Sequence, residues 1–282
     1  MNKMNAQATT FAPYPAPTAE FRVITPEIAK KMLEANTRNR SIRSENLAKL
    51  VRDMEAGNFK CNGDGIRFDR NGVMLDGQHR LLALLQTGTT HQMLVVTGLA
   101  PEVMPTIDVG ARKEAGDFLA LEGYLNGKKI AATINVLAGL ARGMEKRTLT
   151  TSEVFDVLAA HPGIVESYDA AKAIKLISPS YVAAFHYAGY CTGYGNRADQ
   201  FVEVLRTGFA ETPDDPAYQA REKFIRARAS IRSIQRNEAL EILAAAWELS
   251  RVGKTVKRLQ LRKGSNRLSI HGWNDTVFWG KG

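Results

Sequence analysis

The chain has 282 residues, 44% of them hydrophobic and 24% charged, which is typical of soluble globular proteins and leaves room for one large or two ordinary domains. No run approaches the roughly 20 apolar residues of a membrane helix, and no apolar signal-peptide core is present at the start, so we expect no membrane partner. The net charge is +9, and residues 221–267 hold 13 Lys and Arg against 4 Asp and Glu, which equals the whole excess. Localised positive charge favours DNA as a partner, with a solvated helix face as the plain alternative.

The first hundred residues predict a mixed α/β unit. The Ala/Pro/Thr-rich residues 1–20 are typical of a disordered arm. Two helices are expected next, one beginning at Thr25-Pro26 and one from Ser44 to Gly57. Asn71-Gly72 predicts a hairpin turn between two short strands. A leucine-rich helix ending near Gly88 and a strand at 93–96 complete this part.

Beyond residue 100, the spacing of the apolar residues mostly follows the helical period. The expected helices span 113–123, 127–142, 151–160, 164–174, 179–190, 197–207, 216–230 and 236–251. A basic, strand-like tail, VKRLQLRK, follows. We therefore predict an α+β fold: a disordered arm at 1–20, a mixed domain at 21–125 and a helical, basic domain at 126–282.

Asp76-Gly77-Gln78-His79-Arg80 lies where a strand ends and a helix begins. The first turn of a helix presents unpaired N–H groups and the positive end of the dipole, so anions bind there readily. Gly77 permits close backbone approach, Arg80 suits phosphate oxygens, and His79 can donate a hydrogen bond or move a proton. Asp76 can cap the helix, orient His79 or act as a base. The string predicts a phosphate site, and a simply capped helix is the alternative.

The strand followed by DGQHRLLAL resembles the second motif of the ParB/sulfiredoxin-like superfamily, most closely the ParB-like proteins of phages and actinobacteria. The resemblance covers about residues 23–120 and implies a nucleotide-phosphate site at Gly77, Gln78, His79 and Arg80. It implies ATP or CTP with Mg²⁺ as the ligand. Position 78 holds Gln where sulfiredoxins place their reactive Cys, which argues against their thiol chemistry.

Two further clusters are predicted to complete the site. Asn39, Arg40 and Arg43 lie in a basic loop between helices, where ParB-like proteins place their first motif. Asp108 and Arg112 precede a later helix and resemble the third phosphate-side segment of that family. We expect Asp108 to hold Mg²⁺ or to act as a base. A polar interhelical loop and a helix-entry turn are the respective alternatives.

Two smaller features have plainer readings. Asp64, between two glycines, is interpreted as a turn residue. The two cysteines, Cys61 and Cys191, have no metal-ligand spacing, which favours packing roles in a reduced, cytoplasmic protein; for a phage-encoded chain this is the host cytoplasm.

The helical half offers cations for DNA. The expected DNA-binding residues are Arg226, Arg228, Arg232, Lys254, Lys257, Arg258, Arg262 and Lys263. No base-reading motif is recognisable, so weak sequence specificity is expected. Aromatic residues of 181–194 are interpreted as core, with base stacking as the alternative. Trp273, Phe278 and Trp279 are expected to anchor the C-terminal tail on the body or on a partner.

These features favour a nucleotide-binding, DNA-associated ParB-like protein, which as a binding switch should hydrolyse NTP slowly. The first alternative is an ATP-dependent kinase acting on a hydroxylated DNA base or a small alcohol, with Asp76 or Asp108 as proton acceptor. A ParB-like nuclease ranks lower, because two-metal nucleases need several convergent acids. A structural DNA-binding protein is the fourth reading. A homodimer stays open, since the sequence does not fix the oligomeric state.

Overall fold

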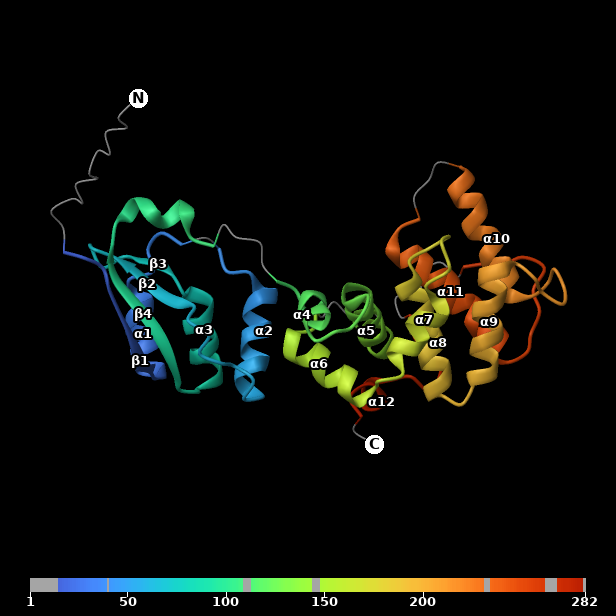
Figure 1. The fold of residues 1–282 in the computed structure, drawn as a ribbon, viewed down its shortest axis with the longest axis horizontal. Helices are drawn as coiled ribbons and strands as arrows, with labels where there is room; N and C mark the ends of the chain where they lie inside the picture. Colours follow the sequence, from blue (N-terminus) through green and yellow to red (C-terminus); the bar gives the residue numbers. More distant parts are fainter. Residues whose placement is uncertain are drawn as a thin grey trace, which may run out of the picture. The chain divides into compact units, whose positions relative to one another are not determined.

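The structure is a computed structural model that describes residues 15–39, 41–108, 113–143, 148–230, 234–261 and 268–280. The fold is mixed: helices predominate and a four-stranded sheet is present. The chain divides into two compact units, Met1–Ala111 and Arg112–Gly282, called unit 1 and unit 2 (Figure 1). Each unit has its own hydrophobic core. The predicted division into a mixed part and a helical part is therefore found.

Unit 1 contains the sheet and three α-helices. Its elements are β1 (Thr18–Ile24), α1 (Pro26–Glu34), α2 (Ser44–Glu55), β2 (Gly65–Asp69), β3 (Met74–Asp76), α3 (Gln78–Thr87), β4 (His91–Leu99) and the 3₁₀ helix η1 (Pro101–Thr106). The strand order is β1-β4-β2-β3. β1 is antiparallel to β4, β2 is parallel to β4, and β3 is antiparallel to β2. The sheet therefore has β1 and β3 at its two edges.

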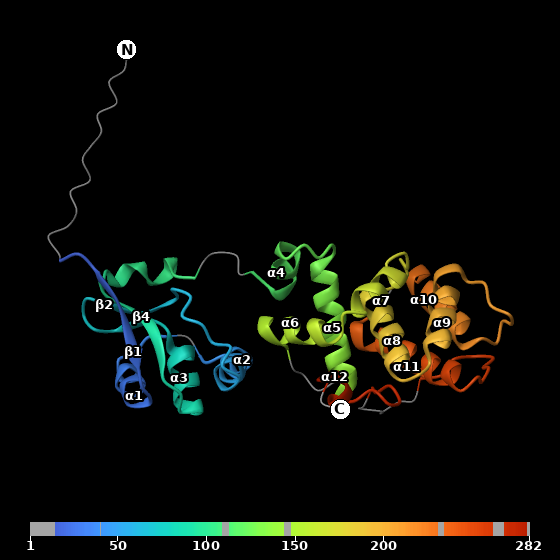
Figure 2. The same cartoon turned by 60° about the horizontal axis from the view of Figure 1, so that its bottom comes forward.

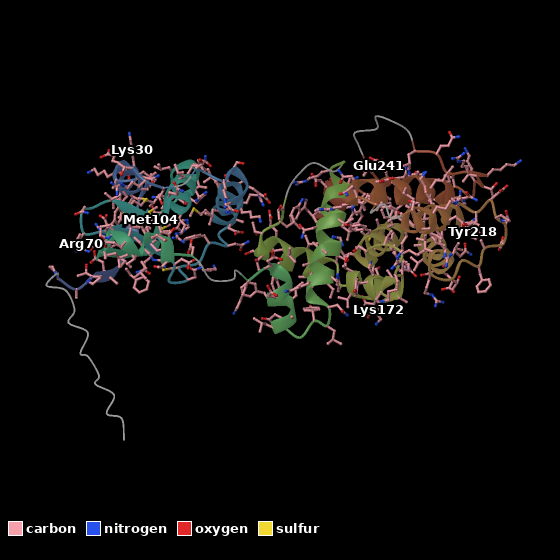
Figure 3. All side chains as sticks on the ribbon, turned by 90° about the horizontal axis from the view of Figure 1, so that it is seen from above. Lys30, Arg70, Met104, Lys172, Tyr218 and Glu241 are labelled. Atoms are coloured by element: carbon pink, nitrogen blue, oxygen red, sulfur yellow. The ribbon has the colours of Figure 1, made fainter. Side chains whose placement is uncertain are left out.

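One face of this sheet is covered by helices. In Figure 2, α1 and α3 lie together on one side of the strands. Ile24, Ile66 and Met93 are fully or almost fully buried and belong to the core of unit 1. On α1, Ala29 is buried, whereas its neighbour Lys30 is exposed and points away from the unit (Figure 3). Such an alternation is what an amphipathic helix on a sheet requires.

Local chemistry explains the ends of these elements. The Thr25 hydroxyl accepts from the Ile28 N–H and caps α1, with Pro26 in the first turn, as the sequence predicts. The Asn-Gly turn is also confirmed: Gly72 has φ 78°, and β2 and β3 pair on either side of it. Asp69 fixes this turn, because its Oδ1 accepts from the N–H groups of Asn71 and Val73 at 2.8 and 2.9 Å.

Unit 2 is helical. Its helices are α4 (Ala115–Leu121), α5 (Gly127–Ala141), α6 (Thr151–Ala160), α7 (Ile164–Ala171), α8 (Pro179–Cys191), α9 (Gly195–Thr207), α10 (Pro216–Ala229), α11 (Arg236–Arg251) and α12 (Asp275–Phe278). Each helix expected from the sequence is present within a few residues of its predicted ends. The shortest helix, α12, was not predicted.

The C-terminal segment is anchored on the body of unit 2, which confirms one of the two expected anchorages. Trp273 and Phe278 are buried, and the indole N–H of Trp273 donates to the Leu137 carbonyl at 3.0 Å. Arg142 holds the Asp275 carboxylate with its Nε at 2.7 and 2.9 Å from the two oxygens. These contacts join the end of the chain to α5.

The predicted domain boundary at 125/126 differs from the observed boundary at 111/112. The reason is that α4 packs directly on the start of α5. Gly116 and Gly127 lie so close that a Cβ on either residue would overlap backbone atoms across the contact. Two helices that meet at glycines in this way form one folding unit, so α4 belongs to the helical part.

Three other expectations need correction. The predicted arm of residues 1–20 ends too late, because Thr18–Glu20 form the first part of β1; residues 1–14 lie outside the described part. Residues 256–261 of the strand-like tail form no strand, and Leu259 alone is buried among them. Both cysteines, Cys61 and Cys191, are exposed rather than packed. None of the helices described has the length and apolar run that a membrane span requires.

Candidate functional site

The start of α3 is built around Gly77. This residue is the N-cap of α3 and has φ 107°, in the left-handed region. A Cβ at this position would lie 3.1 Å from both the Cα and the Cγ1 of Ile66, which is fully buried. Glycine is thus required here by its own backbone angle and by the close approach of β2. Gly77 was predicted to let a ligand approach the backbone, whereas the group that its small size admits is Ile66.

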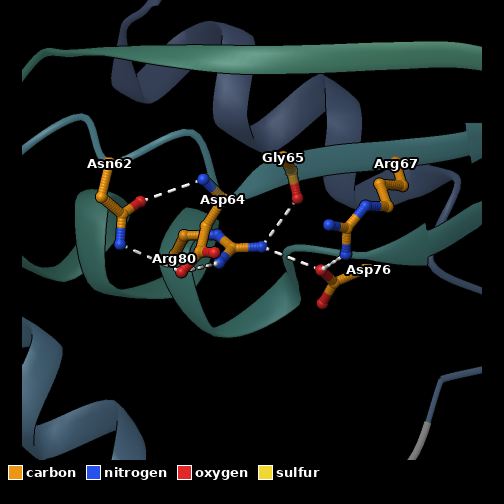
Figure 4. A network of polar contacts seen from close by, with 6 residues as sticks. All are labelled: Asn62, Asp64, Gly65, Arg67, Asp76 and Arg80. Atoms are coloured by element: carbon orange, nitrogen blue, oxygen red, sulfur yellow. Dashed lines mark hydrogen bonds and ion pairs between the residues drawn. The ribbon is translucent and has the colours of Figure 1, made fainter. Parts of the chain in front are cut away.

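Arg80 and Asp76 form the centre of a polar network beside this turn (Figure 4). One oxygen of Asp76, Oδ2, accepts from Arg67 Nη1 at 2.8 Å and from Arg80 Nη2 at 3.0 Å. Arg80 Nη2 also donates to the Gly65 carbonyl at 2.7 Å, and Arg80 Nη1 lies 3.6 Å from Asp64 Oδ2. The Arg80 fork is therefore occupied by protein oxygens and holds β2, β3 and α3 together.

The first turn of α3 also meets the loop between α1 and α2. Asn36 Nδ2 donates to Gln78 Oε1 at 3.2 Å, and Gln78 is only 5% exposed. Asn39 Nδ2 donates to Asn36 Oδ1 at 2.5 Å and to the Met74 carbonyl at 2.9 Å. The predicted proximity of this loop to the GQHR turn is thus found. Within this contact, the side chains of Asn39 and Gln78 serve as structural links.

His79 is held by the same loop. The backbone N–H of Arg43 donates to His79 Nε2 at 3.0 Å. An accepting Nε2 means that the ring carries its proton on Nδ1 in this arrangement. The side chains of Arg38 and Arg43 are exposed. The loop 36–43 thus carries two exposed arginines, and its backbone positions the His79 imidazole at the start of α3.

Among the remaining predicted site residues, Asp108 is not brought to the polar network of Asp76 and Arg80. Asp108 follows η1, is exposed, and has φ 58°, an uncommon backbone angle for a residue with a side chain. The chain enters η1 from the Leu99 end of β4, which pairs with Asp69, whereas the polar network lies at the Gly65 end of β2. Arg40, and Arg112 at the start of unit 2, lie outside the described residues.

The structure offers no ready-made metal cage in its described parts. No group of three or more His, Cys, Asp or Glu side chains there is arranged to hold a metal ion. Magnesium is commonly bound through one or two carboxylates together with substrate phosphates and water. Asp108, an exposed carboxylate, remains the predicted protein ligand.

Four cations of unit 2 lie on or beside the contact of α10 with the segment after α11. Lys223 Nζ donates to the Leu259 carbonyl at 3.5 Å, and Arg226 lies one turn further along the same face of α10. Lys257 and Arg258 directly precede Leu259 and are exposed, as is Arg226. We call Lys223, Arg226, Lys257 and Arg258 the basic surface of unit 2. It unites three of the predicted DNA-binding residues with one that the prediction omitted.

The other predicted DNA-binding residues are separate from this surface or not described. The Arg228 side chain turns to the loop before α8, where its Nη1 donates to the Lys175 carbonyl at 3.1 Å. Lys254 lines a groove of about 1140 Å³ between α9, the loop 208–215 and the end of α11. Arg232, Arg262 and Lys263 lie outside the described residues.

The aromatic residues of α8 divide between core and surface. Phe185 and Tyr187 are buried, which confirms the core reading for them. Tyr190 is 50% exposed, and its hydroxyl donates to Asp199 Oδ2 at 2.7 Å; this bond raises the pKa of Tyr190. Asp199 Oδ1 lies 3.0 Å from Nε2 of buried His186, whose Nδ1 lies 3.0 Å from Ser167 Oγ. Because Ser167 is buried, this Ser-His-Asp array has no exposed nucleophile.

Sequence reasoning missed Arg67 and gave Asp64 a minor role. A signal for Arg67 was present, since it alternates with buried Ile66 and Phe68 on a predicted strand and faces the opposite side. Its register partner across the hairpin is Asp76, and opposite charges at paired positions attract each other. Asp64 gives no such signal, because its approach to Arg80 depends on how α3 packs against the sheet.

Comparisons with known proteins give no further guide. No family model matches the chain, and neither the curated proteins nor the solved structures contain a significant match to it.

Proposed function

We propose that this chain binds a nucleoside triphosphate with Mg²⁺ through unit 1 and DNA through unit 2, as a ParB-like protein. The strand–DGQHR–helix arrangement on which that resemblance rests is present as β3, Gly77 and α3. The observation that carries the proposal is the meeting of the loop 36–43 with the first turn of α3, through the Arg43–His79 and Asn36–Gln78 hydrogen bonds.

The polar network changes the roles that we assign within the site. Arg80 and Gln78 hold the architecture, since both side chains are engaged with protein groups. The phosphate contacts fall instead to the positive end of the α3 dipole, to His79 and to the exposed guanidinium groups of Arg38 and Arg43. Guanidinium groups pair with phosphate oxygens in a bidentate manner, which suits a triphosphate tail.

Calorimetry tests this proposal on the full chain. Mg²⁺ with ATP, CTP, GTP or UTP is titrated into the wild type and into the Arg38→Ala/Arg43→Ala variant. We expect one nucleotide to bind, and the double variant to weaken its binding by about tenfold or more for each lost cation. The matched control is Lys30→Ala/Lys31→Ala, which removes two exposed charges from α1 and leaves affinity unchanged.

Two results contradict the proposal: no binding of any of the four nucleotides by the wild type, or equal affinity of all three proteins. Arg80→Ala is a poor test, because the loss of its three protein contacts lowers stability as well as binding. His79→Ala adds a further variant, which removes the imidazole together with the acceptor of the Arg43 N–H and should also weaken nucleotide binding.

A kinase is the second candidate for this site and receives less support. In a kinase mechanism, Asp76 or Asp108 would take the proton of the acceptor hydroxyl. The Asp76 Oδ2 atom already accepts from two guanidinium groups, so this oxygen is engaged by the protein rather than free to approach an acceptor hydroxyl. Transfer of labelled γ-phosphate to a hydroxylated DNA base or to a small alcohol would favour the kinase, and release of free phosphate alone would favour the nucleotide switch.

A further inference from the structure

The outer edge of β1 is an open hydrogen-bonding edge of the sheet in unit 1. β1 pairs with β4 on one side and stands at the end of the strand order, so no described strand pairs with its other side. Along an edge strand, every second residue turns its backbone N–H and C=O groups outward. Six of the seven residues of β1 are exposed, and only Ile24 is buried.

The sequence of this edge is self-complementary. β1 reads TAEFRVI, with Glu20 and Arg22 on either side of Phe21. If two copies pair in antiparallel orientation about Phe21, Glu20 of each copy lies opposite Arg22 of the other. The arrangement forms two opposite-charge pairs by symmetry. Within one copy, Arg22 Nε lies only 3.6 Å from Glu20 Oε1, so both side chains already lie on the same face.

The other face of the edge is apolar. Phe21 and Val23 are 60% and 58% exposed, and Ala19 lies on the same face two residues before Phe21. The register with β4 places Phe21 beside Leu94 and Ala19 beside Val96, so the apolar stripe continues into the sheet. In the antiparallel pair, Phe21 meets Phe21 of the second copy, and Ala19 meets Val23. Aromatic and β-branched cross-strand contacts stabilise such pairs.

We propose that β1 is a dimerisation strand whose partner is β1 of a second copy of this chain. The two four-stranded sheets then form one continuous sheet of order β3-β2-β4-β1-β1-β4-β2-β3. The two-fold axis passes through the Phe21 pair. A second copy is favoured over an unrelated strand because the charges of this edge are complementary to themselves. An isologous interface of this kind closes after two copies and stops there.

Charge reversal tests the pairing on the full chain, with sedimentation velocity as the measurement. We expect the wild type to dimerise in a concentration-dependent manner. Glu20→Arg places Arg opposite Arg22, Arg22→Glu places Glu opposite Glu20, and each change acts twice in a symmetric dimer. Each single variant should therefore raise the dimer dissociation constant by about tenfold or more.

Two complementary samples restore the attraction. The Glu20→Arg/Arg22→Glu double variant pairs Arg with Glu again, and so does an equimolar mixture of the two single variants, which should form heterodimers. Arg206→Glu is the matched control: it reverses an exposed charge that pairs with Glu203 in unit 2 and should leave dimerisation unchanged.

Cross-linking fixes the register. In a Cys61→Ser/Cys191→Ser background, Phe21→Cys should form an intermolecular disulfide, because residue 21 faces itself across the axis. Val23→Cys should not, since the two copies of residue 23 lie about 13 Å apart, four residues along the strand. A wild type that stays monomeric, single reversals that dimerise normally, or equal cross-linking at both positions would each overturn the proposal.

Discussion

Gly77 shows how a single residue can serve architecture within a motif that looks like a ligand site. Its φ of 107° and the 3.1 Å approach of a Cβ to the Ile66 backbone are independent constraints. The first is a conformational restriction and the second a steric one. The motif therefore fixes the relation of α3 to β2 before any ligand is considered.

Gly77→Ala is expected to destabilise unit 1 more than Gly72→Ala. Gly72 also has a positive φ, of 78°, but nothing lies within 4 Å of its Cβ position. It should therefore lose only about 1 kcal/mol of unfolding free energy from backbone strain, whereas Gly77→Ala adds the clash with Ile66. Far-UV circular dichroism in urea measures both variants. Equal losses of unfolding free energy in the two variants would show that Ile66 can move aside at no cost in stability.

His91 gives unit 1 a dependence on pH. Its ring stands 4.8 Å from the Phe59 ring, and burial lowers the pKa of His91 from its ordinary value of 6.5. The unfolded chain therefore takes up a proton more readily than the folded one. The stabilising contribution is complete above pH 6.5 and is lost as the pH falls through the folded-state pKa.

We expect urea midpoints of unit 1 to fall between pH 7.5 and pH 5.5, and His91→Gln to reduce this fall. Circular dichroism follows both units, so the midpoint of unit 1 is taken from the part of its transition that tryptophan fluorescence, which reports on unit 2, does not share. His271→Gln, at an exposed position in unit 2, is the control and should leave the fall in place. A fall of equal size in wild type and His91→Gln would assign the effect to other groups.

At the scale of elements, α12 shows that four residues suffice for a helix when tertiary contacts hold it. The Phe278 carbonyl lies 2.9 Å from Nε2 of buried His161, and the Nδ1 atom of that ring lies 2.9 Å from the Tyr187 hydroxyl. Burial raises the pKa of Tyr187, so its hydroxyl remains protonated over the ordinary pH range. Packing and this buried hydrogen-bond chain stabilise α12, because a helix so short has no stability of its own.

Phe278→Ala is expected to lower the unfolding free energy of unit 2 by about 3–5 kcal/mol through the cavity that it leaves. Phe278 is 1% exposed and contacts the rings of Trp273 and Trp279, so tryptophan fluorescence in urea reports directly on the change. Phe209→Ala is the control, since Phe209 is 84% exposed and should change stability by less than about 0.5 kcal/mol. Similar losses in both variants would contradict the anchoring role.

Local chemistry made most elements predictable. The helices with clear caps, the Asn71-Gly72 turn and the helix after Gly77 follow from signals within a few residues of each boundary. β1 was missed because an exposed edge strand buries almost nothing and gives no alternation of burial. The strand-like reading of residues 256–261 was wrong because its apolar residues pack on helices, where no neighbouring strand is described.

The candidate site was predictable only in part, for a related reason. The DGQHR string and the loop 36–43 could be identified as polar clusters, and their proximity followed from the resemblance. The sequence does not show which of these side chains are already engaged by protein groups. That engagement depends on the pairing of β2 with β3 and on the packing of α3. Arg80 is the clear case: Gly65 and Asp64, which engage it, are more than ten residues away along the chain.

At the scale of the whole molecule, the two units differ in their charge and in their tryptophan content, and each has its own core. All three tryptophans belong to unit 2, at positions 247, 273 and 279. Fluorescence therefore follows unit 2 alone, whereas circular dichroism follows both units. Most of the excess positive charge also belongs to unit 2, which holds 25 Lys and Arg against 18 Asp and Glu, whereas unit 1 holds 13 against 11. DNA binding should consequently depend on this unit.

Alanine at Arg226, Lys257 and Arg258 is expected to weaken DNA binding and to flatten its salt dependence. Each lost phosphate contact should reduce the slope of log K against log salt by about 0.9. Fluorescence anisotropy with a labelled duplex gives the slope. The control removes Lys172, Lys175 and Arg206, which are exposed elsewhere in unit 2. Equal slopes in the two triple variants would show that the basic surface of unit 2 is not the DNA contact.

The pairing of β1 with β4 has a consequence for biosynthesis. Thr18–Ile24 leaves the ribosome long before its partner His91–Thr97 is made, and translation of the intervening stretch, about 70 residues, takes roughly 4–14 seconds at ordinary elongation rates. During that interval β1 has both edges open, and it carries Phe21 and Val23. Glu20 and Arg22 keep charge on one face of the unpaired strand, which makes it less prone to join unrelated apolar strands. Because these two charges are complementary to themselves, the strand that they favour under the proposed pairing is β1 of a second copy.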